Sequence, residues 1–270
     1  MKKWNTKKLR ELKKAPFKPL SMLTCYDYQT AQMLNESLVD LILVGDSVGN
    51  VILGYPNTVS VSLDEMITFG AAVKRGAPQK FTVVDMPFGT YATKDLAIKN
   101  GLSLFQKTNA EALKLEGHSS EILKSINLLT NSGVPVMGHL GLTPQSVHQQ
   151  GGYFTHGKSN KEKTLILKNA KELQEAGAFA LVLECVTCEL AAEIESELTI
   201  PTIGIGSSSY CDGQILVTDD MLGISGFYPK FVKKYVNLDR LIEKAVKKYT
   251  RDVKLNKFPK KKNFLNGTKH

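Results

Sequence analysis

Six short apolar runs in this 270-residue chain each end on a polar side chain that could take part in chemistry. These side chains are Asp46, Asp85, Glu116 (with Lys114 two residues earlier), His139, Glu184 and Ser207. Short apolar runs are typical of buried parallel strands. When such strands close into a barrel, their carboxyl ends meet at one mouth, where catalytic groups gather. The pattern therefore predicts that residues far apart in the sequence form one active site.

Asp46, Asp85 and Glu116 are three carboxylates expected at nearby strand ends. Carboxylates that are brought together repel one another unless a cation lies between them. A set of oxygen ligands without histidine favours a hard cation, Mg²⁺ first. Each acid alone could equally be a loop or helix-capping residue, but three of them at nearby strand ends favour a metal site.

Lys114 and Glu116 lie two residues apart on one predicted strand, so their side chains share a face. Because Leu113 and Leu115 alternate with them, we expect the leucines to pack under helices and the charged pair to face the barrel interior. An interior ammonium group needs an anionic partner or ligand. Lys114 could bind a substrate carboxylate or form a Schiff base, and the metal-type acids favour the first role. A lysine that only reaches the barrel rim is the third alternative.

His139 and Glu184 are the remaining candidates for proton chemistry. His139 follows Gly138, and glycine lets backbone and ligand approach closely. The sequence supports a functional and a structural role for this histidine equally. Glu184 follows the apolar residues 181–183, a setting that suits a carboxylate to act as a general base. The alternative is an acid that caps the helix after the strand.

The elements that would position these groups alternate between strands and helices. Strands are predicted at about residues 21–27, 41–46, 81–87, 112–117, 134–141, 180–186, 200–206 and 214–220. Helices are predicted at about 28–36, from Ser62, from Thr93, at 119–131, at 161–176, from Cys188 and from Asp220. This alternation indicates parallel pairing, and eight units in a chain near the roughly 250 residues of a barrel favour a (β/α)8 TIM barrel. A doubly wound open sheet is the alternative, but no GxGxxG motif opens a helix after the first strand.

We expect one domain over residues 1–270, because no linker or low-complexity segment interrupts residues 20–245. The barrel core would cover about 20–245, with an extra basic N-terminal helix in 1–19 and a basic C-terminal tail at 251–270. The two ends are rich in lysine: residues 1–20 carry +7 and residues 251–270 carry +6 of a net charge of +9, which leaves −4 on the rest of the chain. Neither end interleaves aromatic residues with arginine as nucleic-acid modules do, so we expect no nucleic-acid partner.

The hydrophobicity pattern and the cysteines indicate where in the cell the protein is expected. No apolar run approaches the roughly 20 residues of a transmembrane helix, so we expect no membrane partner. The lysine-rich start is not followed by the apolar segment of a secretory signal, which favours the cytoplasm. Cys185 and Cys188 form a C-x-x-C pair without a second ligand pair at a suitable spacing. We expect these two thiols, with Cys25 and Cys211, to be unpaired.

Several longer segments resemble the ketopantoate hydroxymethyltransferase family. They are VGDS (44–47), MPFGTYAT (86–93), KLEG (114–117), GHLGLTPQS (138–146), GGY (151–153), LVLEC (181–185), IGIG (203–206), DGQILV (212–217) and PKF (229–231). The resemblance extends from about Met22 to Tyr235. It implies a barrel of the phosphoenolpyruvate/pyruvate-binding superfamily.

The resemblance also implies an activity. The expected reaction transfers a hydroxymethyl group from 5,10-methylenetetrahydrofolate to 3-methyl-2-oxobutanoate, which is the first committed step of pantothenate biosynthesis. Mg²⁺ is the implied cofactor, bound by Asp46, Asp85 and Glu116. The implied assembly is a homo-oligomer, a decamer in many bacterial members.

The implied roles extend to the remaining candidates. The 2-oxo acid is expected to be held by Asp46, Ser47, Asp85 and Lys114. Glu184 is expected to accept the proton. We expect His139 to form hydrogen bonds in the site, in a supporting role that the sequence does not define further.

The chain departs from the family pattern at Ser207-Ser208, where Ala-Gly usually follows IGIG, and at Val59-Ser60. These changes bear on folate affinity or loop packing, and not on the metal or the base. Three other functions compete. One is a metal-dependent lyase or mutase of the same superfamily that acts on another 2-oxo acid without folate. The others are a Schiff-base aldolase that uses Lys114, and a binding protein with an inactive barrel.

Overall fold

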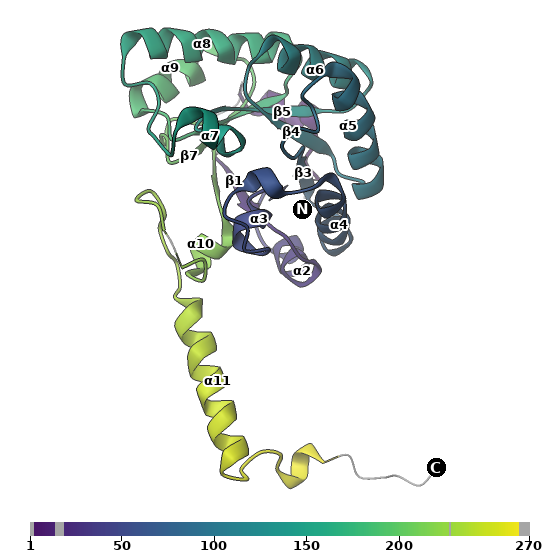
Figure 1. The fold of residues 1–270 in the computed structure, drawn as a ribbon, viewed down its shortest axis with the longest axis vertical. Helices are drawn as coiled ribbons and strands as arrows, with labels where there is room; N and C mark the ends of the chain where they lie inside the picture. Colours follow the sequence, from purple (N-terminus) through teal and green to yellow (C-terminus); the bar gives the residue numbers. More distant parts are fainter. Residues whose placement is uncertain (1–2, 14–18, 227, 265–270) are drawn as a thin grey trace. The chain divides into compact units, whose positions relative to one another are not determined.

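The structure, a computed structural model, describes residues 3–13, 19–226 and 228–264. The chain divides into two compact units, residues 1–218 and 219–270. In the first unit, eight parallel strands close into a barrel in the order β1 to β8 (Figure 1). The strands are β1 (Leu20–Thr24), β2 (Leu41–Val44), β3 (Phe81–Asp85), β4 (Ala112–Glu116), β5 (Val136–Gly141), β6 (Ala180–Glu184), β7 (Thr202–Ile205) and β8 (Gly213–Leu216). The predicted (β/α)8 barrel is confirmed.

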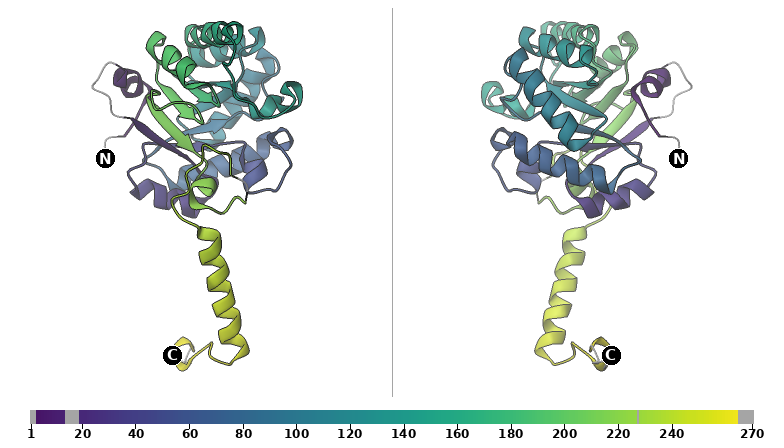
Figure 2. Two further views of the ribbon diagram at one scale, coloured as in Figure 1. Left: turned by 90° about the vertical axis from the view of Figure 1, so that its left-hand side faces the viewer. Right: turned by 90° about the vertical axis from the view of Figure 1, so that its right-hand side faces the viewer.

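Helices cover the outside of the barrel (Figures 1 and 2). They are α2 (Tyr28–Glu36), α4 (Leu63–Gly76), α5 (Lys94–Thr108), α6 (Ser120–Asn131), α8 (Asn160–Glu175) and α9 (Cys188–Glu197). The short helices α3 (Val48–Val51) and α7 (Val147–Gln150) lie in the loops after β2 and β5. Local capping explains where several of them begin. At α4, the Ser62 side chain accepts a hydrogen bond from the Glu65 backbone, and the Glu65 side chain accepts one from the Ser62 backbone, so this capping box is confirmed.

The charged side chains and the leucines of β4 lie on opposite faces of the strand. Leu113 and Leu115 are buried in the apolar layer between the strands and the helices. Lys114 and Glu116 lie on the other face and line a cavity within the barrel mouth. Ala112, further down the same inner face, packs with apolar residues that fill the barrel interior. The alternation predicted from the sequence thus aims two charged groups at the mouth.

Helix α1 (Thr6–Leu12) packs against the barrel interior near its amino end. It begins after Asn5, whose side-chain oxygen accepts a hydrogen bond from the backbone N–H of Lys8. Leu9 is buried in the same apolar cluster as interior residues of the strands. The indole N–H of Trp4 donates to Asp40 at 3.1 Å. Residues 1–2 and 14–18 of the predicted N-terminal segment lie outside the described residues.

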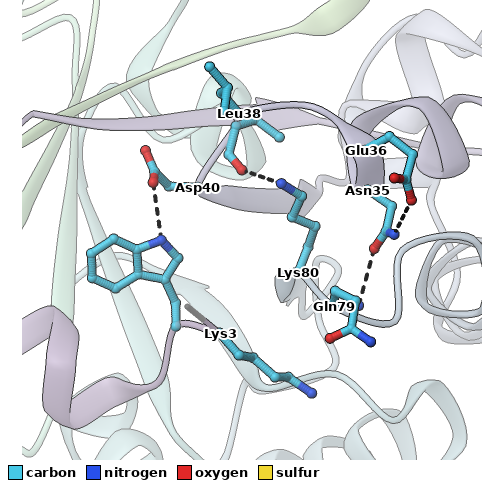
Figure 3. Close-up of a pocket in the computed structure, with 9 residues that line it drawn as sticks. Lys3, Asn35, Glu36, Leu38, Asp40, Gln79 and Lys80 are labelled. Atoms are coloured by element: carbon cyan, nitrogen blue, oxygen red, sulfur yellow. Dashed lines mark hydrogen bonds between the residues drawn. The ribbon is translucent and has the colours of Figure 1, made fainter. Parts of the chain in front are cut away.

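A cavity of about 460 Å³ lies beside Trp4, between the segments that precede β2 and β3 (Figure 3). Its polar groups are engaged with one another. The Lys80 ammonium group donates to the carbonyl oxygens of Ser37 and Val39, each at 2.7 Å. This cavity lies at the opposite end of the strands from the predicted site. In TIM barrels this end serves stability rather than catalysis.

The second unit contains the end of α10 (Thr218–Leu222) and the long helix α11 (Leu238–Lys254). No side chain of α11 is buried. Tyr249 packs edge to face with Phe258, with ring centroids 5.7 Å apart. Residues 265–270 of the predicted basic tail lie outside the described residues, and the single domain over residues 1–270 stays a prediction. Across the described ranges, the helices are too short or too polar for a transmembrane segment.

Candidate active site

One cavity of about 110 Å³ at the carboxyl ends of the strands brings the predicted residues together. It is lined by all seven of them: Asp46, Ser47, Asp85, Lys114, Glu116, His139 and Glu184. Thr58 and Pro144 come from loops above the barrel. Thr24 of β1, Val217 just after β8 and apolar side chains of β2, β6, β7 and β8 form the rest of the wall. The barrel therefore gathers residues that are up to 138 positions apart in the sequence.

Asp46 and Asp85 are held in direct contact. The backbone N–H of Asp46 donates to Asp85 Oδ2 at 3.1 Å. Burial, reinforced by the negative charges of Glu116 and Asp85, raises the pKa of Asp46 well above its ordinary value. Burial also raises the pKa of Asp85, although Lys114 opposes the shift. The two carboxyl groups therefore repel each other in a site that is poor in water.

Lys114 is the cation closest to these acids. Its Nζ lies 3.2 Å from Asp85 Oδ1 and 3.7 Å from Glu116 Oε1. Burial lowers the pKa of Lys114, but the attraction of Asp85, Glu116 and Asp46 outweighs it and raises the pKa above the ordinary value for lysine. Lys114 therefore stays an ammonium group. This argues against the aldolase alternative, because a Schiff-base lysine needs a neutral amine.

His139 bridges two carboxylates. Its Nδ1 lies 3.1 Å from Glu116 Oε1 and its Nε2 lies 3.2 Å from Glu184 Oε2. Burial and Lys114 lower the pKa of His139, but Glu116 and Glu184 outweigh them and raise it to about 9. Although burial opposes the change, the charge and hydrogen bond of His139 hold the pKa of Glu116 below its usual range. The imidazolium form donates from both nitrogens, so the 3.3 Å approach of the Lys114 ammonium is no hydrogen bond.

Ser47 precedes α3 and lies beside Asp46 in the wall of the cavity. Its Oγ is 2.8 Å from the hydroxyl of the buried Tyr26. Gly45 leaves room for this arrangement, because a Cβ atom at that position would lie 2.7 Å from Ser47 Oγ. The Ser47 hydroxyl is thus fixed beside Asp46, the residue of this loop that is predicted to bind both the metal and the substrate.

Sequence reasoning missed two residues that hold the acids in place. Gln145 Nε2 donates to Asp46 Oδ2 at 2.7 Å, and the Gln145 backbone N–H donates to Glu116 Oε2 at 3.1 Å. The Tyr91 hydroxyl donates to Gln145 Oε1 and so fixes the orientation of the amide. Both residues lie in the segments MPFGTYAT and GHLGLTPQS, which is the only signal that the sequence offers. Their chemistry is otherwise that of ordinary loop residues.

The acids fit a hard divalent cation by their chemistry. Asp85 Oδ1 is buried and accepts no hydrogen bond from the described residues, and the repulsion that raises the pKa of Asp46 would be relieved by a cation. Within the described ranges, no three His, Cys, Asp or Glu side chains are already grouped as a metal site. Asp46 and Glu116 accept hydrogen bonds from Gln145 and His139, and the remaining lone pairs of their carboxylate oxygens could bind an ion.

Ser207 and Ser208, which depart from the family pattern, are not among the described residues that line this cavity. Ser208 Oγ accepts from the backbone N–H of Tyr210 at 3.2 Å and lies 3.1 Å from Cys188 Sγ. The carbonyl oxygen of Ser208 accepts from the Gln214 side chain at 2.7 Å. These contacts give Ser208 a part in the packing of the loop between β7 and β8.

Gly141, the last residue of β5, lets the chain pass close to the backbone of Glu184. Its φ is +92°, and a Cβ atom there would lie 2.1 Å from the carbonyl oxygen of Glu184. We expect Gly141→Ala to lower the free energy of unfolding about 1–3 kcal/mol more than Gly151→Ala does, because only the first substitution overpacks. Gly151 also has positive φ, of +76°, but a Cβ atom there meets nothing within 4 Å. Equal losses in urea titrations of the two variants would contradict the steric argument.

Comparison with known proteins gives a consistent family. The sequence model of the family described as "Ketopantoate hydroxymethyltransferase" matches residues 3–261. Two proteins named 3-methyl-2-oxobutanoate hydroxymethyltransferase are close relatives. The one from Trichodesmium erythraeum is 51% identical over 90% of this chain and 92% of its own length. The one from Thermotoga maritima is 47% identical over 94% of each chain.

Solved structures give the same fold at much lower identity. 2,3-Dimethylmalate lyase, described as a PEP mutase/isocitrate lyase superfamily member, aligns with a TM-score of 0.62 at 15% identity, over 98% of this chain and 92% of its own. Phosphoenolpyruvate phosphomutase from Streptomyces platensis subsp. rosaceus aligns with a TM-score of 0.63 at 10% identity, over 94% and 88%. At these identities the likeness bears on the fold alone.

Proposed function

Because the chain belongs to the ketopantoate hydroxymethyltransferase family, we propose that it transfers a hydroxymethyl group from 5,10-methylenetetrahydrofolate to 3-methyl-2-oxobutanoate, giving 2-dehydropantoate. One observation carries the proposal. A single small cavity holds a pair of acids suited to Mg²⁺, a buried ammonium group and a further carboxylate on the opposite strands. These are the groups that enolisation of a 2-oxo acid needs.

The proposed cofactor is Mg²⁺, held by Asp46, Asp85 and Glu116. When bound, it acts as a Lewis acid on the 2-oxo acid and makes the proton on C3 more acidic. The residues that would hold the 2-oxo acid are Asp46, Ser47, Asp85 and Lys114, all of which line the cavity. The small cavity suits a compact branched substrate, because Val182, Ile205 and Ile215 give it an apolar wall.

Glu184 is the proposed proton acceptor. It ends β6 and faces the cavity, and its Oε2 contacts His139 Nε2 at 3.2 Å. The imidazolium of His139 lies between Glu116 and Glu184 and orients the base, which is the supporting role proposed for it. After C3 loses its proton, the carbon attacks the methylene carbon of the folate as one of its two carbon–nitrogen bonds breaks and that nitrogen takes up a proton. Water then replaces the second nitrogen, which also takes up a proton, so the products are 2-dehydropantoate and tetrahydrofolate.

This function would place the protein in pantothenate biosynthesis, at its first committed step. We propose that it works in the cytoplasm as a homo-oligomer, a decamer as in many family members. Its partners would be the 2-oxo acid and the folate, without nucleic acid or membrane. The second candidate is a metal-dependent lyase or mutase that acts on another 2-oxo acid without folate; 2,3-dimethylmalate lyase shares the fold.

Deuterium exchange tests the proposal. In D₂O with Mg²⁺, the protein should exchange the C3 proton of 3-methyl-2-oxobutanoate, followed by NMR, and a chelator should stop the exchange. In the sample with Mg²⁺ and without chelator, adding 5,10-methylenetetrahydrofolate should yield 2-dehydropantoate. Exchange without product would favour the lyase or mutase. Exchange that survives chelation, with borohydride trapping at Lys114, would favour the aldolase, and no exchange would favour a binding protein.

A further inference from the structure

Thr58 is a cavity residue to which neither the motifs nor the proposed mechanism gives a role. It is the first residue of the short helix η1 (Thr58–Ser60), in the loop after α3, and it lines the same cavity as the proposed catalytic groups. Its side chain is buried, with 4% of the residue exposed. Its Oγ1 forms no hydrogen bond with the described residues. A buried hydroxyl without a partner destabilises the folded protein, so its presence needs an explanation.

The surrounding loop holds Thr58 in this position. The Asn57 side chain accepts a hydrogen bond from the backbone N–H of Val59 at 3.1 Å and caps η1. The backbone N–H of Val61 donates to the Thr58 carbonyl oxygen at 3.2 Å. Val61 is buried, and its Cγ2 would lie 2.6 Å from a Cβ atom at Gly49, which shows how closely the loop packs on α3. The loop therefore holds Thr58 in the wall of the cavity, although its hydroxyl forms no hydrogen bond with the described residues.

Other buried polar atoms of the same cavity have a charged neighbour within the protein. Asp85 Oδ1 lies 3.2 Å from Lys114 Nζ, and His139 Nε2 lies 3.2 Å from Glu184 Oε2. Thr58 Oγ1 is neutral and forms no hydrogen bond with the described residues, so it does not take part in the charge balance of the site. A neutral hydroxyl in such a place can donate one hydrogen bond to an oxygen of a bound molecule.

We propose that Thr58 is a substrate-binding residue whose hydroxyl donates a hydrogen bond to the carboxylate of the 2-oxo acid. This inference rests on the proposed function. A carboxylate can accept about four hydrogen bonds. The Lys114 ammonium group also contacts Asp85 and Glu116, so it can occupy only part of the acceptor sites of the substrate carboxylate. At least one site is left for the Thr58 hydroxyl. Thr58 thus adds to the binding of the 2-oxo acid without adding charge.

The test compares two isosteric substitutions. Thr58→Val should weaken binding of 3-methyl-2-oxobutanoate about 10-fold or more in isothermal titration with Mg²⁺ present, because a hydrogen bond to a charged group is lost. Thr58→Ser should bind within about 2-fold of wild type, because it keeps the hydroxyl. Thr82→Val is the matched control, because its hydroxyl on β3 is also buried and unpaired among the described residues but does not line the cavity.

Stability separates binding from a structural role. Without substrate, Thr58→Val and Thr82→Val should both unfold at or above the wild-type temperature, because each removes a buried hydroxyl without a protein partner. A lowered unfolding temperature for Thr58→Val alone would overturn the inference in favour of a structural hydroxyl. Wild-type affinity in Thr58→Val, or an equal loss in Thr82→Val, would overturn it as well. If the wild-type protein does not bind the 2-oxo acid, the proposed function fails, and this inference fails with it.

Discussion

Replacing Glu184 by glutamine should slow exchange of the substrate C3 proton about 10²–10⁴-fold, which is the usual contribution of a general base. The amide has nearly the same shape as the carboxylate and can still accept a hydrogen bond from His139 Nε2, which lies 3.2 Å from Glu184 Oε2. It cannot accept a proton from carbon. The loss should therefore appear in the exchange rate and in kcat, while affinity for the 2-oxo acid stays near the wild-type value.

The measurement follows C3 deuteration of 3-methyl-2-oxobutanoate by NMR in D₂O with saturating Mg²⁺. Glu189→Gln is the matched control, because Glu189 is an exposed acid in the first turn of α9, just beyond β6. It should exchange at the wild-type rate. Rapid exchange by Glu184→Gln would remove Glu184 as the base. His139 would be the next residue to test, because it is the group in direct contact with Glu184.

The parts of the fold that the sequence predicted well are those where local chemistry decides the structure. The range 28–36 predicted for a helix coincides with α2, whose start is capped by the Asp27 side chain. The strand predicted over 21–27 ends at Thr24 instead, because that cap turns the chain into α2. The apolar run alone could not show where pairing stops, since Cys25 and Tyr26 are as buried as the strand itself.

The candidate site was predictable where a residue ends a strand. The alternation of leucine with Lys114 and Glu116 fixes which side chains face the barrel interior, and barrel closure then brings the strand ends together. Gln145 and Thr58 are different, because loops outside the strands carry them: Thr58 lines the cavity, and Gln145 holds two of the acids that line it. Gln145 contacts Asp46 from 99 positions away, and no periodic pattern records such a contact. The sequence therefore predicts the groups on the barrel better than the loop residues that surround them.

Replacing Lys114 should lower both the stability of the protein and its affinity for the 2-oxo acid. Replacing it by methionine, which has a similar volume, leaves Asp85, Glu116 and Asp46 buried without their closest lysine. Breaking a buried ion pair from one side typically costs about 3–5 kcal/mol, so we expect a loss of that size in the free energy of unfolding at neutral pH. Binding of the 2-oxo acid should be lost as well, because the ammonium group is also its proposed partner.

The pH dependence identifies the cause of that loss. Burial raises the pKa of Asp85 and Lys114 opposes that rise, while Lys114 also helps to hold the pKa of Glu116 below its ordinary value. The contribution of Lys114 to stability is therefore present while these acids are ionised and is lost as the pH falls through their pKa values in the folded protein, first that of Asp85 and then that of Glu116. The difference between wild type and Lys114→Met, measured by urea unfolding, should therefore be large near pH 7 and shrink toward about pH 4. A difference that does not change with pH would point to lost packing instead of unpaired acids.

Lys80→Met is the control that separates stability from function. Lys80 is also buried, but its ammonium group donates to the backbone carbonyls of Ser37 and Val39 at the opposite end of the strands. Its replacement should lower stability because two buried carbonyl groups lose their donor, while the affinity for the 2-oxo acid should not change. If Lys114→Met bound the 2-oxo acid as tightly as Lys80→Met, Lys114 would be a structural cation that neutralises the acids, and another group would have to hold the substrate carboxylate.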